Sequence, residues 1–121
     1  MSTRRLPLFL LQLSLSLGLA ACGGSVEADR FMVKSSGSLQ CQPSVTTQSR
    51  LDAEIAALRA AGAVVEGGRC VLDGVARPAV CGASAGEAFE VVVAVESVPV
   101  ARQLGFESAD LYPDRKPLAC R

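Results

Sequence analysis

Residues 88–95, Ala-Phe-Glu-Val-Val-Val-Ala-Val, are the strongest strand signal in the chain. β-branched and aromatic side chains favour extended strands, and a nearly continuous apolar run is typical of a strand covered on both faces of its sheet. A glycine-containing stretch at 82–86 comes before the run and indicates a loop there. The run therefore predicts a central strand, around which the rest of the chain has to be arranged.

A helical pattern precedes this strand over residues 49–61. Leu51, Ile55 and Leu58 recur at spacings of four and three residues, which places them on one face of a helix. Ser49 stands where a capping side chain is favoured. The pattern predicts an amphipathic helix whose apolar stripe packs into the core of its own domain.

Three further segments complete the predicted order of elements. Residues 31–34 predict a first strand, and residues 63–72 predict a second, which Gly67-Gly68 interrupts with a bulge or a bend. Residues 98–104 predict a short helix after the central strand. The order strand, helix, strand, strand, helix predicts a small two-layer α+β domain, with about three mostly antiparallel strands and one or two helices on one face.

The beginning of the chain has the order of a secretion signal. Arg4 and Arg5 precede an uncharged, largely apolar run from Leu6 to Ala21. A membrane-spanning helix needs roughly 20 apolar residues, and this run has sixteen residues with polar interruptions. We therefore expect residues 1–21 to be cleaved from the mature protein.

The junction Leu19-Ala20-Ala21-Cys22 resembles the lipobox of bacterial lipoproteins, in which a branched apolar residue and two small residues precede a cysteine. The resemblance covers only the signal and its junction. It implies that the thiol of Cys22 receives a diacylglycerol, so that acyl chains such as palmitate anchor the protein in the cell envelope. Gly23 resembles the sorting pattern for the outer membrane, facing the periplasm, rather than the inner membrane of a host with two membranes.

Charge and length limit the partners of the mature chain. The whole chain has twelve Lys and Arg and twelve Asp and Glu, and removing Arg4 and Arg5 leaves ten basic against twelve acidic residues, a formal charge of −2. This balance argues against nucleic acid as a partner. The remaining length has room for one domain. We therefore divide the mature chain into a lipidated cysteine with a short tether, 22–30, and a single α+β domain, 31–121.

The five cysteines fall into two groups, the lipobox residue Cys22 and the four cysteines of the domain. With Cys22 assigned to lipid, Cys41, Cys70, Cys81 and Cys120 remain, an even set in a chain exported to an oxidising compartment. They predict two disulfides, and the sequence leaves all three pairings open. We favour Cys70 with Cys81 across a local loop, and Cys41 with Cys120 tying the chain end to the first strand.

The sequence carries no signature of a metal site, a cofactor site or a catalytic site. It has no histidine, and its domain cysteines lack the close pairs that structural zinc sites use. Gly82–Gly86 fits the Gly-x-Ser-x-Gly pattern of a serine nucleophile, but no histidine is present to act as its base. Glu87, Glu90 and Glu96 are expected at solvated strand ends. We therefore expect no metal, no cofactor and no catalytic residue.

These features favour a non-catalytic envelope lipoprotein that acts by binding or scaffolding. Its expected partners are the membrane, through the lipid at Cys22, and an envelope protein. The segment from Asp73 to Gly86 is the candidate binding loop, because it is long and rich in small residues. The alternative is a small-ligand carrier or a simple periplasmic hydrolase, which requires a pocket between the long helix and the sheet.

Overall fold

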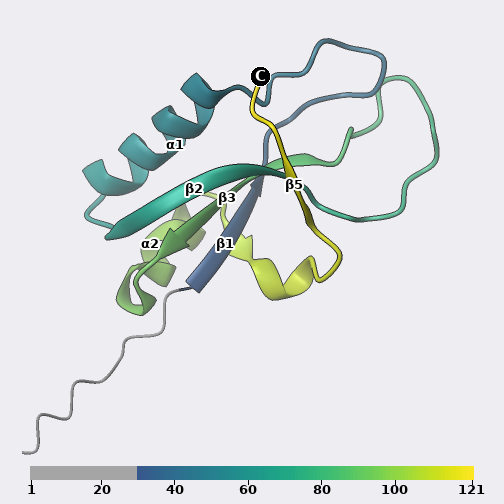
Figure 1. Ribbon diagram of the computed structural model, residues 1–121. Helices are drawn as coiled ribbons and strands as arrows, with labels where there is room; N and C mark the ends of the chain where they lie inside the picture. Colours follow the sequence, from purple (N-terminus) through teal and green to yellow (C-terminus); the bar gives the residue numbers. More distant parts are fainter. Residues whose placement is uncertain (1–29) are drawn as a thin grey trace, which may run out of the picture.

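One five-stranded sheet organises residues 30–121, the part of the chain that the computed structural model describes (Figure 1). The strands lie in the order β4-β1-β3-β2-β5, and every neighbouring pair is antiparallel. The expected signal peptide and Cys22 lie outside the described residues. Within them, no helix has the length and apolar character to cross a membrane. The elements are β1 (Arg30–Ser35), α1 (Gln48–Ala60), β2 (Val65–Leu72), β3 (Glu87–Val93), η1 (Val95–Ser97), α2 (Val98–Gln103), β4 (Glu107–Ser108), η2 (Ala109–Leu111) and β5 (Lys116–Leu118).

Strand β3 is the central strand, as the apolar run at 88–95 predicts. Phe89 and Val91 are buried on one side of the sheet and Ala88 on the other, so β3 is covered on both faces. The α+β class is confirmed. The expected number of about three strands is too low, because β4 and β5 add edge strands of two and three residues. Strands this short leave no periodic signal in the sequence.

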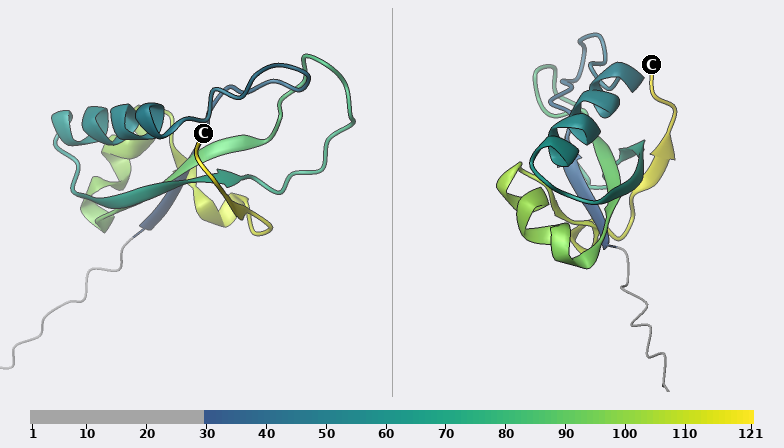
Figure 2. Two further views of the ribbon diagram at one scale, coloured as in Figure 1. Left: turned by 45° about the horizontal axis from the view of Figure 1, so that its top comes forward. Right: turned by 90° about the vertical axis from the view of Figure 1, so that its left-hand side faces the viewer.

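The helices cover one side of the sheet, called the helix face here (Figure 2). Leu58 of α1 and Ala101 of α2 pack in one buried cluster with Met32 and Val91 of the sheet. This cluster is the main hydrophobic core, so the two-layer arrangement supplies most of the buried apolar surface. A smaller buried cluster lies on the opposite face and consists of Val33, Val71, Ala88 and Ala109, with Tyr112 packed against it.

The capping residue of α1 differs from the expected one. Thr47, not Ser49, caps α1, since its hydroxyl accepts a hydrogen bond from the Arg50 amide at 3.2 Å. Ser97 precedes α2 but makes no capping bond. Its buried hydroxyl instead accepts a hydrogen bond from the Val64 amide at 2.8 Å, which ties the approach to β2 to the η1 turn.

A β-bulge in β2 brings a glycine against helix α1. The pairing of β2 with β3 shifts its register just before Gly67, which confirms the predicted interruption at Gly67-Gly68. A Cβ atom on Gly68 would lie 2.9 Å from the backbone oxygen of Glu90. Side-chain carbons of Leu51 and Ile55 on α1 would lie 3.1 and 3.2 Å away. The strand and the helix therefore approach each other too closely at Gly68 for a larger residue.

Gly68→Ala is expected to lower the free energy of unfolding by about 1 to 3 kcal/mol, the usual cost of adding volume to a packed region. Gly67→Ala is the matched control, because a Cβ atom there meets nothing within 4 Å. Urea unfolding of the two variants measures the difference. Equal midpoints would show that the backbone at Glu90 and helix α1 both accommodate the added methyl group without cost.

Two disulfides cross-link the domain, but the favoured pairing is wrong. The bonds join Cys41 to Cys81 and Cys70 to Cys120. Cys70 pairs with Leu118 in the ladder between β2 and β5, so Cys120, two residues after the end of β5, comes close enough to bond with it. Cys81 lies in the connection after β2, where the chain after β1 runs beside it. The pairing prediction failed because it assumed that the segment between Cys70 and Cys81 closes on itself.

Candidate functional site

Two long connections lie together at one end of the sheet and form the loop lobe, defined as residues 36–47 and 73–86 (Figures 1 and 2). The strand register places this lobe opposite to Arg30, because Ser35 pairs with Ala88 at one end of β3 and Arg30 pairs with Val93 at the other. The second connection is the candidate binding loop of the sequence analysis. The first carries no motif that predicts its part in the lobe.

The two connections are joined covalently and through their backbones. The Cys41–Cys81 disulfide is the covalent link. Beside it, the Gln40 amide donates to the carbonyl of Ala83 at 2.8 Å, and the Gly82 amide donates to the carbonyl of Gln40 at 3.1 Å. The lobe is therefore one cross-linked unit rather than two independent loops.

The side chain of Gln40 braces the second connection at three points. Its Oε1 accepts a hydrogen bond from the Val80 amide at 2.9 Å. Its Nε2 donates to the carbonyl oxygens of Pro78 and Ser84, both at 3.1 Å. One amide side chain thus forms hydrogen bonds with backbone groups on both sides of Cys81, and these bonds hold the loop in a single conformation. Sequence analysis missed Gln40, since nothing about a lone glutamine beside a cysteine indicates such a role.

A buried carboxylate fixes the start of the second connection. Asp73 is only 8% exposed. Its Oδ1 accepts hydrogen bonds from the Val75 amide at 2.9 Å and from Arg77 at 2.8 Å, and its Oδ2 forms an ion pair with Arg77 at 2.5 Å. Burial raises the pKa of Asp73, but these hydrogen bonds outweigh it and hold the pKa below its ordinary value. The Arg77 side chain is consequently folded back onto the lobe.

A group of buried hydroxyls surrounds Glu87 at the base of the lobe. The Thr46 hydroxyl lies 2.6 Å from Oε2 of Glu87 and 2.7 Å from Oγ of Ser36, and Ser44 also hydrogen-bonds to Oε2. The hydroxyl of Ser38 lies 2.9 Å from that of Thr46. Burial raises the pKa of Glu87, but the hydrogen bonds from the hydroxyls outweigh it and lower the pKa below its ordinary value.

The lowered pKa of Glu87 predicts that acid destabilises the lobe. A carboxylate whose pKa is lower in the folded state stabilises that state above its unfolded pKa, which for a glutamate is ordinarily 4.5. This contribution is lost as the pH falls from that value through the folded pKa. Glu87→Gln removes it, so we expect a flatter dependence of unfolding midpoint on pH below about 4.5. Equal pH dependence in both proteins would contradict this role.

The outer part of the second connection, residues 75–80, is called the tip. Val75 and Val80 are 48% and 54% exposed, although both are apolar. The tip has neither helical nor turn structure. Clustered apolar side chains on an exposed surface are typical of contact sites for other molecules. The exposed apolar side chains of the tip are those of Val75, Ala76, Pro78, Ala79 and Val80.

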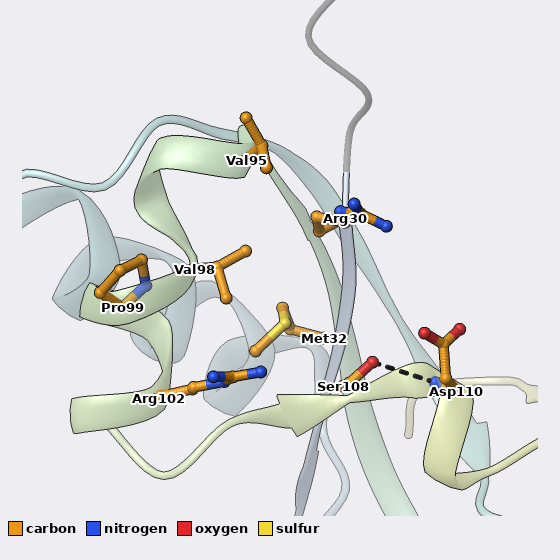
Figure 3. A pocket seen from close by; sticks show the side chains of 8 residues that line it. All are labelled: Arg30, Met32, Val95, Val98, Pro99, Arg102, Ser108 and Asp110. Carbon is orange, nitrogen blue, oxygen red and sulfur yellow. Dashed lines mark hydrogen bonds between the residues drawn. The ribbon is translucent and has the colours of Figure 1, made fainter.

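A cavity of about 370 Å³ lies at the other end of the sheet, between β1, α2 and the β4–η2 segment (Figure 3). Within residues 30–121, the guanidinium groups of Arg30 and Arg102 in its wall form no ion pair. The interface between α1 and the sheet, where the alternative prediction required a pocket, is filled by core side chains instead. The cavity is lined by Arg30, Met32, Val95, Val98, Pro99, Arg102, Ser108 and Asp110.

Glu90 corrects the expectation that the glutamates lie at solvated strand ends. It is 1% exposed in the middle of β3, whereas Glu87 is half-buried and Glu96 is exposed. Oε1 of Glu90 forms an ion pair with Arg69 at 2.6 Å, and Oε2 forms one with Arg115. Two guanidinium groups compensate the loss of hydration of the carboxylate. A more open cavity of about 270 Å³ adjoins Glu90, on the face of the sheet that is opposite to the helix face.

The Gly82–Gly86 motif has a structural place in the lobe. Strand β3 follows it, whereas a serine nucleophile of this pattern stands at a strand-to-helix turn. The Ser84 backbone forms an isolated bridge with Leu39, and its hydroxyl accepts a hydrogen bond from the Gly86 amide at 3.1 Å. The motif therefore helps to join the two connections of the lobe.

Comparison with known proteins adds no assignment. No family model, curated protein or solved structure matches this chain. The loop lobe and the cavity beside Arg30 are therefore interpreted from their own geometry.

Proposed function

We propose that this protein is a non-catalytic, lipid-anchored envelope protein that binds a partner protein through the loop lobe. One observation carries the proposal: two long connections are cross-linked and braced into a single lobe that ends in exposed apolar side chains. Exposed loops on a rigid scaffold commonly carry binding function. A surface fixed in advance loses little conformational entropy on binding, which favours affinity.

The proposed anchor agrees with the position of the lobe. The chain enters β1 at Arg30, and residues 22–30 reach at most about 30 Å from a lipid at Cys22. The lobe lies at the end of the sheet farthest from this attachment point. A partner in the periplasm is therefore accessible to the tip while the protein is held on the membrane, with the outer membrane as the proposed location.

Site-specific photo-crosslinking in intact cells tests the proposal. A photoreactive amino acid at Ala79 is expected to give a discrete crosslinked complex with one envelope protein, and Val80→Asp is expected to reduce its yield. Val64→Asp is the matched control, because Val64 is 50% exposed but lies near the other end of the sheet. Cys22→Ser should move the protein out of the membrane fraction.

The proposed binding role fails if Val80→Asp and Val64→Asp change the yield equally. It also fails if position 79 gives no complex. Retention of the Cys22→Ser protein in the membrane fraction would overturn the proposed anchor instead, so the two parts of the proposal are separable.

A small-ligand carrier is the second candidate, and the cavity beside Arg30 favours it. Val98 and Pro99 give this cavity an apolar wall, while Arg30 and Arg102 place two positive charges on it against the one carboxylate of Asp110 (Figure 3). Such a site fits a small anion with an apolar body. Fluorescence of 1-anilinonaphthalene-8-sulfonate should rise with the native protein and not with Arg102→Glu. An equal signal from both proteins would remove this candidate.

A further inference from the structure

The two disulfides within residues 30–121 differ in their exposure. Cys41 and Cys81 are both exposed and belong to neither buried cluster. Cys70 is only 1% exposed, and its partner Cys120 packs against the main hydrophobic core. A thiolate has to reach a sulfur atom to open a disulfide, so access is one of the factors that set the rate of this exchange. The Cys41–Cys81 bond is therefore the one of the two that a reductant in solution can reach.

The loop lobe around the exposed bond carries no unpaired charge. Its two charged side chains, Asp73 and Arg77, pair with each other at 2.5 Å. Cys81 is followed by the exposed Gly82, which adds no side chain beside the bond. The lobe itself therefore sets no electrostatic barrier to a negatively charged thiolate.

Cys41 stands in a backbone conformation that suits glycine. Its φ is 66°, and it is the one residue other than glycine with a positive φ in residues 30–121. The Cβ atom makes this region unfavourable for an L-residue. The turn that contains Cys41 is closed by a hydrogen bond of 3.3 Å from the Gln42 amide to the carbonyl of Leu39. Opening the disulfide removes a restraint on this turn and favours its rearrangement.

The bond holds the outer part of the lobe, which projects beyond the end of the sheet (Figure 2). Gln40, whose main chain and side chain brace the second connection, is directly adjacent to Cys41. Hydrogen bonds that are accessible to water contribute little net stability, so the brace depends on the covalent link that keeps the two connections together. The hydroxyl group around Glu87 at the base of the lobe uses neither cysteine. Opening of the bond is therefore confined to the outer part of the lobe.

We infer that the Cys41–Cys81 disulfide is a redox-controlled site, which a dithiol reductant opens while Cys70–Cys120 stays oxidised, and that the reduced lobe loses its binding conformation. This inference rests on the proposed binding function and adds its regulation. A thiolate of the dithiol attacks one sulfur, forms a mixed disulfide and releases the other cysteine. The second thiolate of the reductant then attacks the mixed disulfide, frees the remaining cysteine and closes the reductant's own disulfide. Two electrons and two protons pass from the dithiol to the protein.

Graded reduction of the full-length, oxidised protein tests the selectivity. Dithiothreitol is the dithiol probe, and free thiols are alkylated and located by peptide mass mapping. Without denaturant, Cys41 and Cys81 are expected to become alkylated at least about tenfold faster than Cys70 and Cys120, because of their access to solvent. Concentrated guanidinium chloride is the control, since unfolding exposes both bonds and should largely remove the difference. Parallel reduction of both bonds in the folded protein would overturn the inference.

Hydrogen exchange on the selectively reduced protein tests the release of the lobe. The amides of Val80, Gly82 and Ala83 form hydrogen bonds within the lobe, so their exchange is expected to rise. The amides of the central strand β3 are expected to stay protected. Unchanged exchange in the lobe would contradict the release. A general rise along β3 would also contradict it, because the domain would then unfold as a whole.

A variant without the exposed bond tests the control of binding. Cys41→Ser combined with Cys81→Ser is permanently open at this site, and it is expected to lower the photo-crosslink yield from Ala79 as strongly as Val80→Asp does. Thermal unfolding confirms that the variant is folded. Native membranes treated with dithiothreitol give a second measurement of the same loss that does not depend on the variant.

Undiminished crosslinking after both treatments would overturn the inference. Dependence of the crosslink on Val80 would still support the proposed binding function in that case. Absence of a crosslink from the oxidised native protein would instead overturn the proposed function, and with it the control of binding. The two failures are therefore distinguishable.

Discussion

Replacement of Cys70 and Cys120 together by alanine is expected to lower the free energy of unfolding by about 4 kcal/mol, the chain-entropy contribution of a loop of this size. The bond joins positions separated by 50 residues and ties the chain after β5 to β2. Small domains are stable by only about 5 to 15 kcal/mol, so the variant loses a large share of its stability. Urea unfolding with the Cys41–Cys81 bond intact measures the change.

The comparison variant lacks Cys41 and Cys81 instead. Its bond spans 40 residues, so the same model predicts a nearly equal loss of about 4 kcal/mol. Hydrogen exchange distinguishes the two, because loss of this second bond should increase exchange at Gln40 and Gly82 rather than along β2 and β5. An unchanged unfolding midpoint after removal of the bond at β5 would contradict the first prediction.

Arg115→Ala is expected to lower the free energy of unfolding by about 3 kcal/mol, in the range found when a buried ion pair loses one partner. The substitution leaves the buried carboxylate of Glu90 with Arg69 alone. It also removes hydrogen bonds that Nη1 of Arg115 donates to the carbonyl oxygens of Ala109 and Tyr112, both at 3.0 Å. Urea unfolding measures this loss.

A double-mutant cycle isolates the electrostatic part of the effect. Glu90→Gln leaves a neutral side chain that needs no cation, so Arg115→Ala should be less destabilising in that background, with a coupling of about 1 to 2 kcal/mol. Arg69→Ala is the control at the more exposed partner, since its side chain is 51% exposed against 20% for Arg115. Strictly additive effects in the cycle would contradict the role assigned to the ion pair.

The central strand and the long helix could be predicted because their signals are local. The apolar run at 88–95 needs no partner to be recognised as a buried strand, and it became β3 at the centre of the sheet. Leu51 and Leu58 are buried at the helical spacing that predicted them. In both elements, the pattern of side chains reflects burial directly.

The disulfide pairing and the burial of Glu90 could not be predicted because both depend on the last strand. β5 has three residues and reaches β2 from far along the chain. Its position brings Cys120 to Cys70, and the segment before it brings Arg115 to Glu90. Contacts across such separations are created by the tertiary fold, and no local sequence pattern predicts them.

The candidate site could be predicted in part. The second connection was recognisable from its length and its small residues, because such composition is typical of loops. The first connection was not, although Gln40 and Thr46 in it hold the lobe together. Their roles depend on which chain segment lies beside them, and that is decided by the pairing of β1 with β3.

The interleaved disulfides have a consequence for how the protein is made. Within residues 30–121 the cysteines occur in the order 41, 70, 81, 120, and the first of these bonds with the third while the second bonds with the last. As the chain emerges from its N-terminus, Cys41 and Cys70 are the first two of these four cysteines that an oxidant can join, and that pair is non-native. Correct maturation therefore requires either that the lobe folds before oxidation or that a disulfide isomerase exchanges the early bond. Cys70 cannot find its partner until the 50 positions that separate it from Cys120 have followed it.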